Sequence, residues 1–167
     1  MPETAVSDTG PIIHLNEIEA MAELSQFEKI IISDVVRMEL QRHNILAIAE
    51  QLLSDIFEVH KVGFNEIAAE RIALFNFKLH HADLSVTALT SRLLPDMVLT
   101  DDLALRKALQ SRECLVVGSI GILFLSFRNG RLSKDELCDV LERLFDDSSL
   151  YLSQGLKKFV LARLNSL

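Results

Sequence analysis

The chain has 167 residues, of which 49% are hydrophobic and 25% are charged, a balance typical of a globular domain with a sizeable core and not of a disordered chain. No apolar run reaches the about 20 residues of a membrane span and the first residues do not resemble a signal peptide, so we expect a cytoplasmic protein that does not enter a membrane. The formal net charge of −7 argues against binding of duplex DNA by bulk electrostatics, but it is compatible with an acidic nuclease site that takes up cations.

Short apolar runs alternate with helix-like patterns along the whole chain. Strands are predicted at residues 4–8, 29–33, 57–62, 97–100 and 115–117. Helices are predicted at residues 12–24, 35–43, 45–54, 66–78, 82–93, 103–111, 120–127, 133–145 and 150–164. This alternation predicts an α/β fold with a mostly parallel five-stranded sheet flanked by helices. The alternating pattern of residues 57–62 places that strand near an edge of the sheet.

We expect a single domain of residues 1–167, because the chain shows no repeat and no linker. Its last part, from about residue 148, is predicted to be a helical extension. The extension carries an apolar stripe formed by Leu152, Leu156, Phe159, Val160, Leu164 and Leu167. This stripe can dock on the chain's own core or form an interface. We predict a homodimer that uses this helix or the helix at residues 133–145.

Aspartates follow two of the predicted strands. The first strand leads into Asp8, and Gly10 and Pro11 then suit a tight turn into a helix. The fourth strand leads in the same way into Asp101 and Asp102. Each aspartate by itself fits a helix N-cap. In a parallel sheet, however, these strand ends lie at one edge, where ligands bind.

Two further carboxylates lie on predicted helices. Glu39 shares a helical face with Val35 and Val36, which is unusual for an ionised group, although a partly solvated position at the edge of the apolar stripe would also explain it. Asp83 opens another helix, where an N-cap is the simpler interpretation. Carboxylates that converge in one cleft repel each other, and Mg²⁺ or Mn²⁺ would neutralise them. Zinc is disfavoured, because the histidines and cysteines lack ligand spacing.

The ordered set of these motifs resembles the PIN domain, and in particular a prokaryotic subgroup of PIN-like nucleic-acid-binding proteins. The matching segments are Val6–Ile13, Val36–Leu40, Ala82–Asp83, Val98–Asp102 and Val117–Leu123. The resemblance implies a three-layer fold and a metal-dependent ribonuclease. It also connects the chain with the toxins of prokaryotic toxin–antitoxin pairs, whose partner is an antitoxin protein.

The resemblance implies that Asp8, Glu39, Asp83 and either Asp101 or Asp102 are the metal-binding and catalytic residues. Many PIN toxins carry the fourth acid at the position of Asp102, whereas the subgroup favours that of Asp101. The third acid is often a glutamate in a Gly-Glu pair, but here Asp83 follows His-His-Ala.

Residues beside these acids are candidates for substrate binding. Thr9 and Thr100 can bind a phosphate or cap a helix, and Arg37 and Arg106 can contact RNA phosphates, although solvated charge is the default for an arginine. The predicted function is therefore an endoribonuclease that uses Mg²⁺ or Mn²⁺, with a toxin role as one option. The alternative is an interaction module that kept the PIN scaffold without efficient catalysis.

Overall fold

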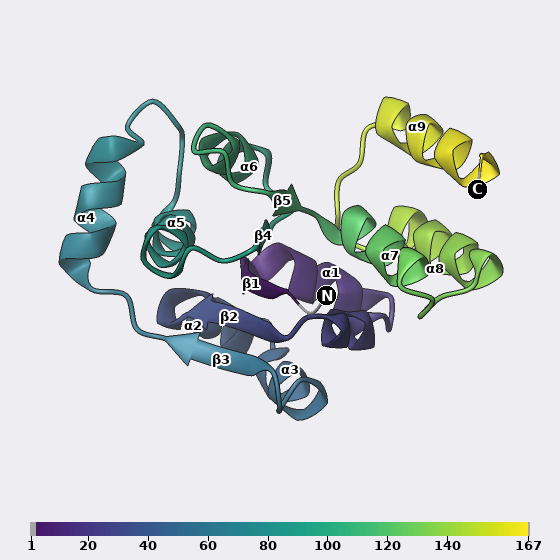
Figure 1. Ribbon diagram of the computed structural model, residues 1–167, viewed down its shortest axis with the longest axis horizontal. Helices are drawn as coiled ribbons and strands as arrows, with labels where there is room; N and C mark the ends of the chain where they lie inside the picture. The colour runs from purple at the N-terminus through teal and green to yellow at the C-terminus, as the bar shows by residue number, and fades with distance from the viewer. Residues whose placement is uncertain (1–2, 167) are drawn as a thin grey trace.

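Five parallel strands form the centre of the fold (Figure 1). They are β1 (Thr4–Ser7), β2 (Lys29–Ser33), β3 (Phe57–His60), β4 (Met97–Leu99) and β5 (Val116–Val117), and their order in the sheet is β3-β2-β1-β4-β5. The computed structural model describes residues 3–166. The predicted fold class is confirmed, and the sheet is parallel at every pairing. Strand β3 lies at an edge, as its alternating sequence predicted.

The strand order reverses direction at β1. From β1 the chain builds outward through β2 to β3, and it then crosses to the other side of β1 to add β4 and β5. Ser7 of β1 is in register with Leu99 of β4, and the amide N–H of Asp8 donates to the Leu99 carbonyl at 2.9 Å. The carboxyl ends of β1 and β4 therefore meet at the switch point, where open α/β sheets bind ligands.

Helices cover both faces of the sheet (Figure 1). They are α1 (Thr9–Glu17), α2 (Asp34–Arg42), α3 (Leu46–Leu52), α4 (Phe64–Ala73), α5 (His81–Leu93), α6 (Leu103–Gln110), α7 (Ser119–Arg128), α8 (Lys134–Asp146) and α9 (Gln154–Asn165), together with the 3₁₀ helix η1 (Met21–Gln26). Helix α5 is buried from Ala82 to Thr90, which fixes its position against the sheet. Among residues 3–166, no helix is long and apolar enough to cross a membrane.

The continuous helix predicted for residues 12–24 is wrong. Helix α1 begins earlier, at Thr9, and ends at Glu17. Glu19 then takes a left-handed backbone conformation with φ of 56°, and the amide of Ala20 returns to the Leu15 carbonyl at 2.8 Å. This left-handed turn ends the helix and lets Met21 bury its side chain from a separate 3₁₀ helix.

The apolar stripe of α9 is divided between a buried and an exposed part. Val160 and Leu164 are buried, and α9 packs on α8, so this part of the stripe docks on the chain's own core. Leu156 and Phe159 stay exposed, and Leu167 lies outside the described residues. The single domain with a helical extension and the homodimer both stay predictions.

Candidate functional site

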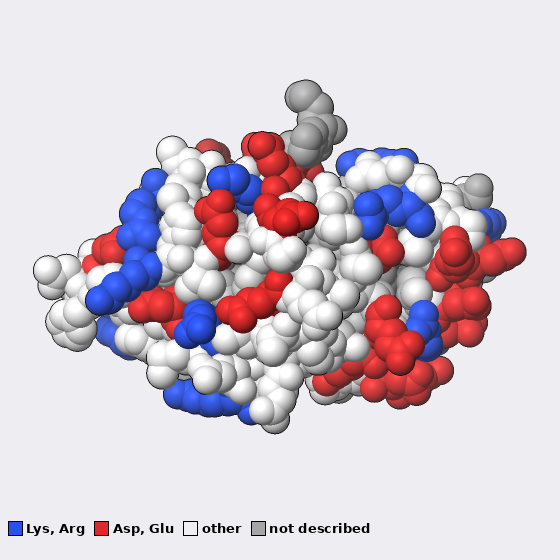
Figure 2. Space-filling model, turned by 90° about the horizontal axis from the view of Figure 1, so that it is seen from below, with Lys and Arg blue, Asp and Glu red and all other residues white. Residues whose placement is uncertain are grey.

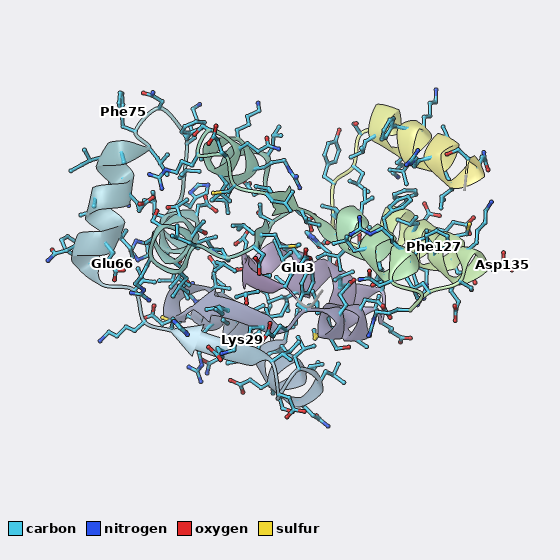
Figure 3. The ribbon with its side chains drawn as sticks, viewed as in Figure 1. Glu3, Lys29, Glu66, Phe75, Phe127 and Asp135 are labelled. Atoms are coloured by element: carbon cyan, nitrogen blue, oxygen red, sulfur yellow. The ribbon has the colours of Figure 1, made fainter. Side chains whose placement is uncertain are left out.

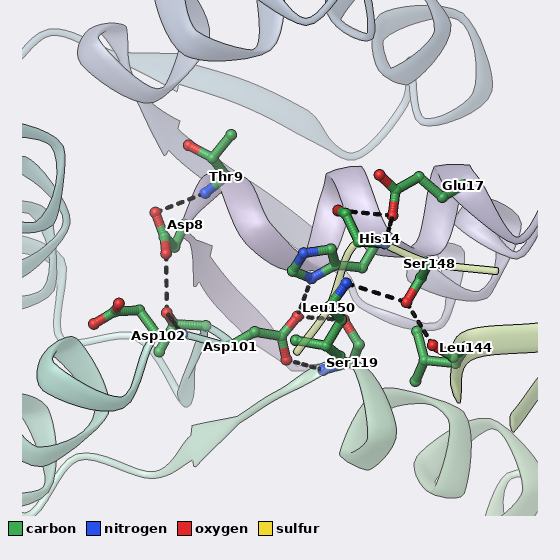
Figure 4. Close-up of polar contacts among 12 residues, drawn as sticks. Asp8, Thr9, His14, Glu17, Asp101, Asp102, Ser119, Leu144, Ser148 and Leu150 are labelled. Carbon is green, nitrogen blue, oxygen red and sulfur yellow. Dashed lines mark hydrogen bonds and ion pairs between the residues drawn. The ribbon is translucent and has the colours of Figure 1, made fainter. Parts of the chain in front are cut away.

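Asp8 lies between β1 and α1, and its carboxylate is buried. Its Oδ1 accepts a hydrogen bond from the Thr9 amide at 2.7 Å, and its Oδ2 accepts one from the Thr100 hydroxyl at 2.9 Å (Figure 4). Burial raises the pKa of Asp8 from 3.8 to about 7 although these two bonds lower it, and the charges of Asp83 and Glu39 raise it further. Asp8 is therefore an N-cap and also part of an acidic cluster.

Glu39 reaches the same place from α2. Val36 and Leu40 bury the apolar face of this helix, while Glu39 remains partly exposed at its edge. The Thr9 hydroxyl donates to Oε2 of Glu39 at 2.5 Å. Thr9 therefore connects the two carboxylates, because its amide binds Asp8 and its hydroxyl binds Glu39.

Asp83 lies in the first turn of α5 and is buried. Asp83 is not the N-cap that the sequence suggested, because His80 takes that position and Asp83 is the third residue of the helix. Its Oδ2 accepts a hydrogen bond from the His80 amide at 2.7 Å, as the acidic member of a capping box. Burial raises the pKa of Asp83, and the charges of Asp102 and Glu39 raise it as well. These mutual effects show that Asp8, Glu39, Asp83 and Asp102 are electrostatic neighbours.

The two adjacent aspartates after β4 point in different directions (Figure 4). Asp102 is exposed and caps α6, because its Oδ1 accepts from the Leu105 amide at 2.7 Å. Asp101 instead accepts from the Ser119 amide at 2.7 Å and from the Ser119 hydroxyl at 2.5 Å, and its Oδ2 lies 2.7 Å from Nδ1 of His14. The structure thus brings Asp102 to the acidic cluster and ties Asp101 to α1 and α7.

The contacts of Asp101 include two residues that sequence reasoning missed. The sequence analysis gave His14 no site role, and Ser119 entered only as part of the matching segment Val117–Leu123. A close approach at Gly118 makes the arrangement possible, because a Cβ atom there would lie 2.6 Å from Oδ1 of Asp101. The Gly118-Ser119 pair directly after β5 was the available signal.

The four candidate substrate-binding residues are placed differently from one another. Thr9 and Thr100 join the acidic cluster through the bonds given above. The Arg106 guanidinium donates to the Thr100 carbonyl at 2.9 Å and to the Val116 carbonyl at 3.1 Å, which braces the loop after β4. Arg37 is exposed on α2, and its Nε lies 3.9 Å from Oε1 of Glu50. The structure therefore does not bring Arg37 to the acidic cluster.

The chemistry of the acidic cluster fits a hard divalent cation. Within residues 3–166, no three side chains of the metal-binding types already stand in an arrangement that could hold a metal ion. The cluster nevertheless offers only carboxylate oxygens, the ligands that Mg²⁺ and Mn²⁺ prefer. Burial is the main cause of the raised pKa values of Asp8 and Asp83, and the charges of neighbouring carboxylates raise them further. A cation would offset the repulsion between these carboxylates.

Comparison with known proteins identifies the family of the chain. A family model described as a PIN domain matches residues 4–166. Among solved structures, a PilT N-terminus domain protein from the hyperthermophilic archaeon Sulfolobus solfataricus P2 is similar, with 10% sequence identity over 89% of this chain and 99% of that chain and a TM-score of 0.44. No curated protein matches the chain. PIN domains are generally nucleases that use divalent metal ions. This chain belongs to the PIN-domain family.

Proposed function

We propose that this protein is a Mg²⁺- or Mn²⁺-dependent endoribonuclease that hydrolyses phosphodiester bonds of RNA at the acidic cluster. The observation that carries this proposal is the convergence of Asp8, Glu39, Asp83 and Asp102 at the switch point of the sheet. They come from four different parts of the fold. Burial raises the pKa values of Asp8 and Asp83, and the charges of the other acids of this set raise them further. The usual nuclease role of PIN domains supports the same reaction class.

The four carboxylates would hold the cation, which when bound supplies activation of water and stabilisation of charge on the phosphate. The chain's own residues position these ligands. The Thr100 hydroxyl holds Asp8, the Thr9 hydroxyl holds Glu39, and the buried start of α5 holds Asp83. Asp102 is exposed, so it can meet substrate and cation from the solvent side. We infer direct attack of water on phosphorus, without a covalent enzyme intermediate.

The test is cleavage of a labelled single-stranded RNA by the purified protein with Mn²⁺ or Mg²⁺. We expect cleavage that EDTA stops and that falls on the order of 100-fold in Asp102→Asn, because that variant keeps the helix cap and loses a charged ligand. Asp55→Asn, an exposed aspartate on the α3–β3 connection, is the matched control and should cleave normally. Equal cleavage by both variants would refute the assigned site, and a DNA strand of the same sequence measures the preference for RNA.

The toxin role is a further part of the proposal, and an antitoxin partner would be its counterpart. The reading frame next to the gene should then encode a small protein. Expression of this chain alone should slow growth, and co-expression of the neighbour should restore it. Growth inhibition that persists in Asp102→Asn would separate toxicity from RNA cleavage.

An interaction module with little catalysis is the second candidate. It is favoured by the hydrogen bonds that each acid of the cluster already makes to its own chain, at Thr9, Thr100, His80 and Leu105. Calorimetric titration distinguishes the candidates, since heat of binding at millimolar Mn²⁺ is expected for the nuclease and none for the module.

A further inference from the structure

A long apolar groove lies at the end of the molecule that carries α9. It has a volume of about 1000 Å³ and opens between the β5–α6–α7 region and the segment from Leu150 to Arg163. Figure 1 shows α9 standing apart from α6 on this side. Most of its lining is aliphatic or aromatic, including Val117, Ile120, Phe124, Leu125 and Leu156. Tyr151 and Phe159 also line it and are 89% and 70% exposed, so the described chain leaves this apolar surface uncovered.

The groove is positively charged, although the chain as a whole is acidic. Three arginines line it, namely Arg106, Arg128 and Arg163. Within the described part of the chain, none of the three has a carboxylate at ion-pair distance. Asp101 also lines the groove, but its carboxylate is bound to Ser119 and His14. Acidic side chains gather elsewhere, for example at the α8 end of the face in Figure 2.

We propose that this groove binds an acidic amphipathic helix of a different protein. The apolar face of that helix would cover Phe159 and Leu156, and its Asp or Glu side chains would meet the groove arginines. The groove follows α9, whose 12 residues span about 18 Å, which is the length of a three-turn helix. An apolar channel flanked mainly by positive charge matches the helix-in-groove mode of recognition. The proposal goes beyond RNA cleavage and does not depend on it.

Charge argues against a second copy of this chain in the groove, and the aliphatic lining argues against an RNA strand. A second copy placed symmetrically on this face would bring Arg128 and Arg163 against the same arginines of its partner, because an isologous contact joins identical surfaces. An RNA strand would find arginines and the exposed rings of Tyr151 and Phe159, but most of the lining is aliphatic, and aliphatic side chains offer no surface on which bases stack. Both occupants are outcomes of the experiment below.

The experiment measures fluorescence anisotropy of a labelled peptide of about 14 residues, with Leu at helical i, i+3, i+4 and i+7 spacing and Glu on the other face. We expect a micromolar dissociation constant for the full chain. A matched peptide with Lys in place of Glu should bind at least about tenfold more weakly, because it meets arginines of the same sign. The Asp102→Asn variant should bind the Glu peptide normally, so that failure of the proposed nuclease and failure of this groove are distinguishable.

Variants locate the binding. Phe159→Ala and Arg163→Glu should each weaken binding of the Glu peptide about fivefold or more, and both residues are exposed, so the fold should persist. Phe75→Ala and Arg71→Glu are the controls, since Phe75 is 80% exposed at the α4 end of the molecule (Figure 3). Circular dichroism verifies folding of each variant. The proposal is overturned if the Glu peptide does not bind, if both peptides bind equally, or if groove and control variants change binding equally. It is also overturned if RNA at equal concentration displaces the peptide, or if light scattering shows that the peptide displaces a second copy of the chain.

Discussion

At the scale of single residues, Asp8 carries a buried charge that opposes folding when no cation is present. Its pKa rises from 3.8 to about 7 on folding, so between roughly pH 4 and pH 7 the folded state binds more protons than the unfolded chain. The contribution of Asp8 to the free energy of unfolding is therefore largest below about pH 4. It declines as pH rises through about 7, in total by on the order of 4 kcal/mol.

We predict that Asp8→Asn stabilises the metal-free protein at about pH 8 and has little effect at about pH 4, because the amide stays neutral at both. Urea unfolding in EDTA across this pH range measures the difference between wild type and variant. A difference that stays constant with pH would contradict the raised pKa of Asp8. Asp96→Asn, a change at an aspartate outside the cluster, controls for general effects of removing a carboxylate.

The neighbouring aspartates after β4 should give opposite results on substitution. Asp101→Asn removes an acceptor from its bonds with Ser119 and His14, and we expect a loss of about 1–3 kcal/mol in the free energy of unfolding. Cleavage per folded molecule should remain. Asp102→Asn should lower cleavage and leave stability nearly unchanged, since Asn also caps helices well. Urea unfolding and an RNA cleavage assay on the same samples separate these effects, and loss of cleavage in Asp101→Asn alone would reverse the assignment.

At the scale of elements, two glycines differ in the space around them. In Gly118→Ala the new Cβ would lie 2.6 Å from Oδ1 of Asp101 and 2.9 Å from the Arg106 guanidinium. Both neighbours are held by other bonds, so we expect destabilisation of about 1–3 kcal/mol. Gly155→Ala in α9 meets open space and should stabilise that helix by up to about 1 kcal/mol. Thermal unfolding of both variants measures the contrast, and a stabilised Gly118→Ala would show that β5 and β4 are not as closely joined as described.

At the scale of the whole molecule, cation binding and folding should be coupled. The ligands must lose protons to bind a cation, and Asp8 does so only around pH 7. We therefore predict that Mn²⁺ raises the unfolding temperature clearly at about pH 8 and weakly at about pH 5.5. A free Mn²⁺ concentration of about 100 times its dissociation constant raises the free energy of unfolding by ~2.7 kcal/mol. Ca²⁺ is the comparison ion, and Asp8→Asn should remove most of the effect. An equal rise at both pH values would mean that the ion binds elsewhere.

The predicted homodimer is also a property of the whole molecule. The mass in solution at micromolar concentration, measured by light scattering, tests it directly. Because the groove beside α9 is proposed to hold a different protein, we expect a dimer to use α8 and to survive the Phe159→Ala change. A monomer would refute the prediction, and a dimer lost in Phe159→Ala would place the interface on α9 and contradict the groove proposal as well.

Local patterns in the sequence determined the five strands, the parallel α/β class and the position of Asp8 at a strand end, because a buried strand needs an apolar run and the carboxyl ends of parallel strands share an edge. Glu39 and Asp83 were expected at the site only from the resemblance to PIN domains. The edge position of β3 and the N-caps at Asp8 and Asp102 are likewise local.

Only the tertiary structure gave the different contacts of Asp101 and Asp102, the end of α1 at Glu17, and the groove beside α9. The direction of Asp101 depends on His14 and Ser119, which lie 87 and 18 residues away in the chain and meet it only after β1, β4 and β5 have paired. Similarly, Val160 and Phe159 are adjacent apolar residues, and only the position of α8 leaves one buried and the other exposed. Side-chain direction and burial depend on neighbours that are distant in sequence, which periodicity along one helix or strand does not identify.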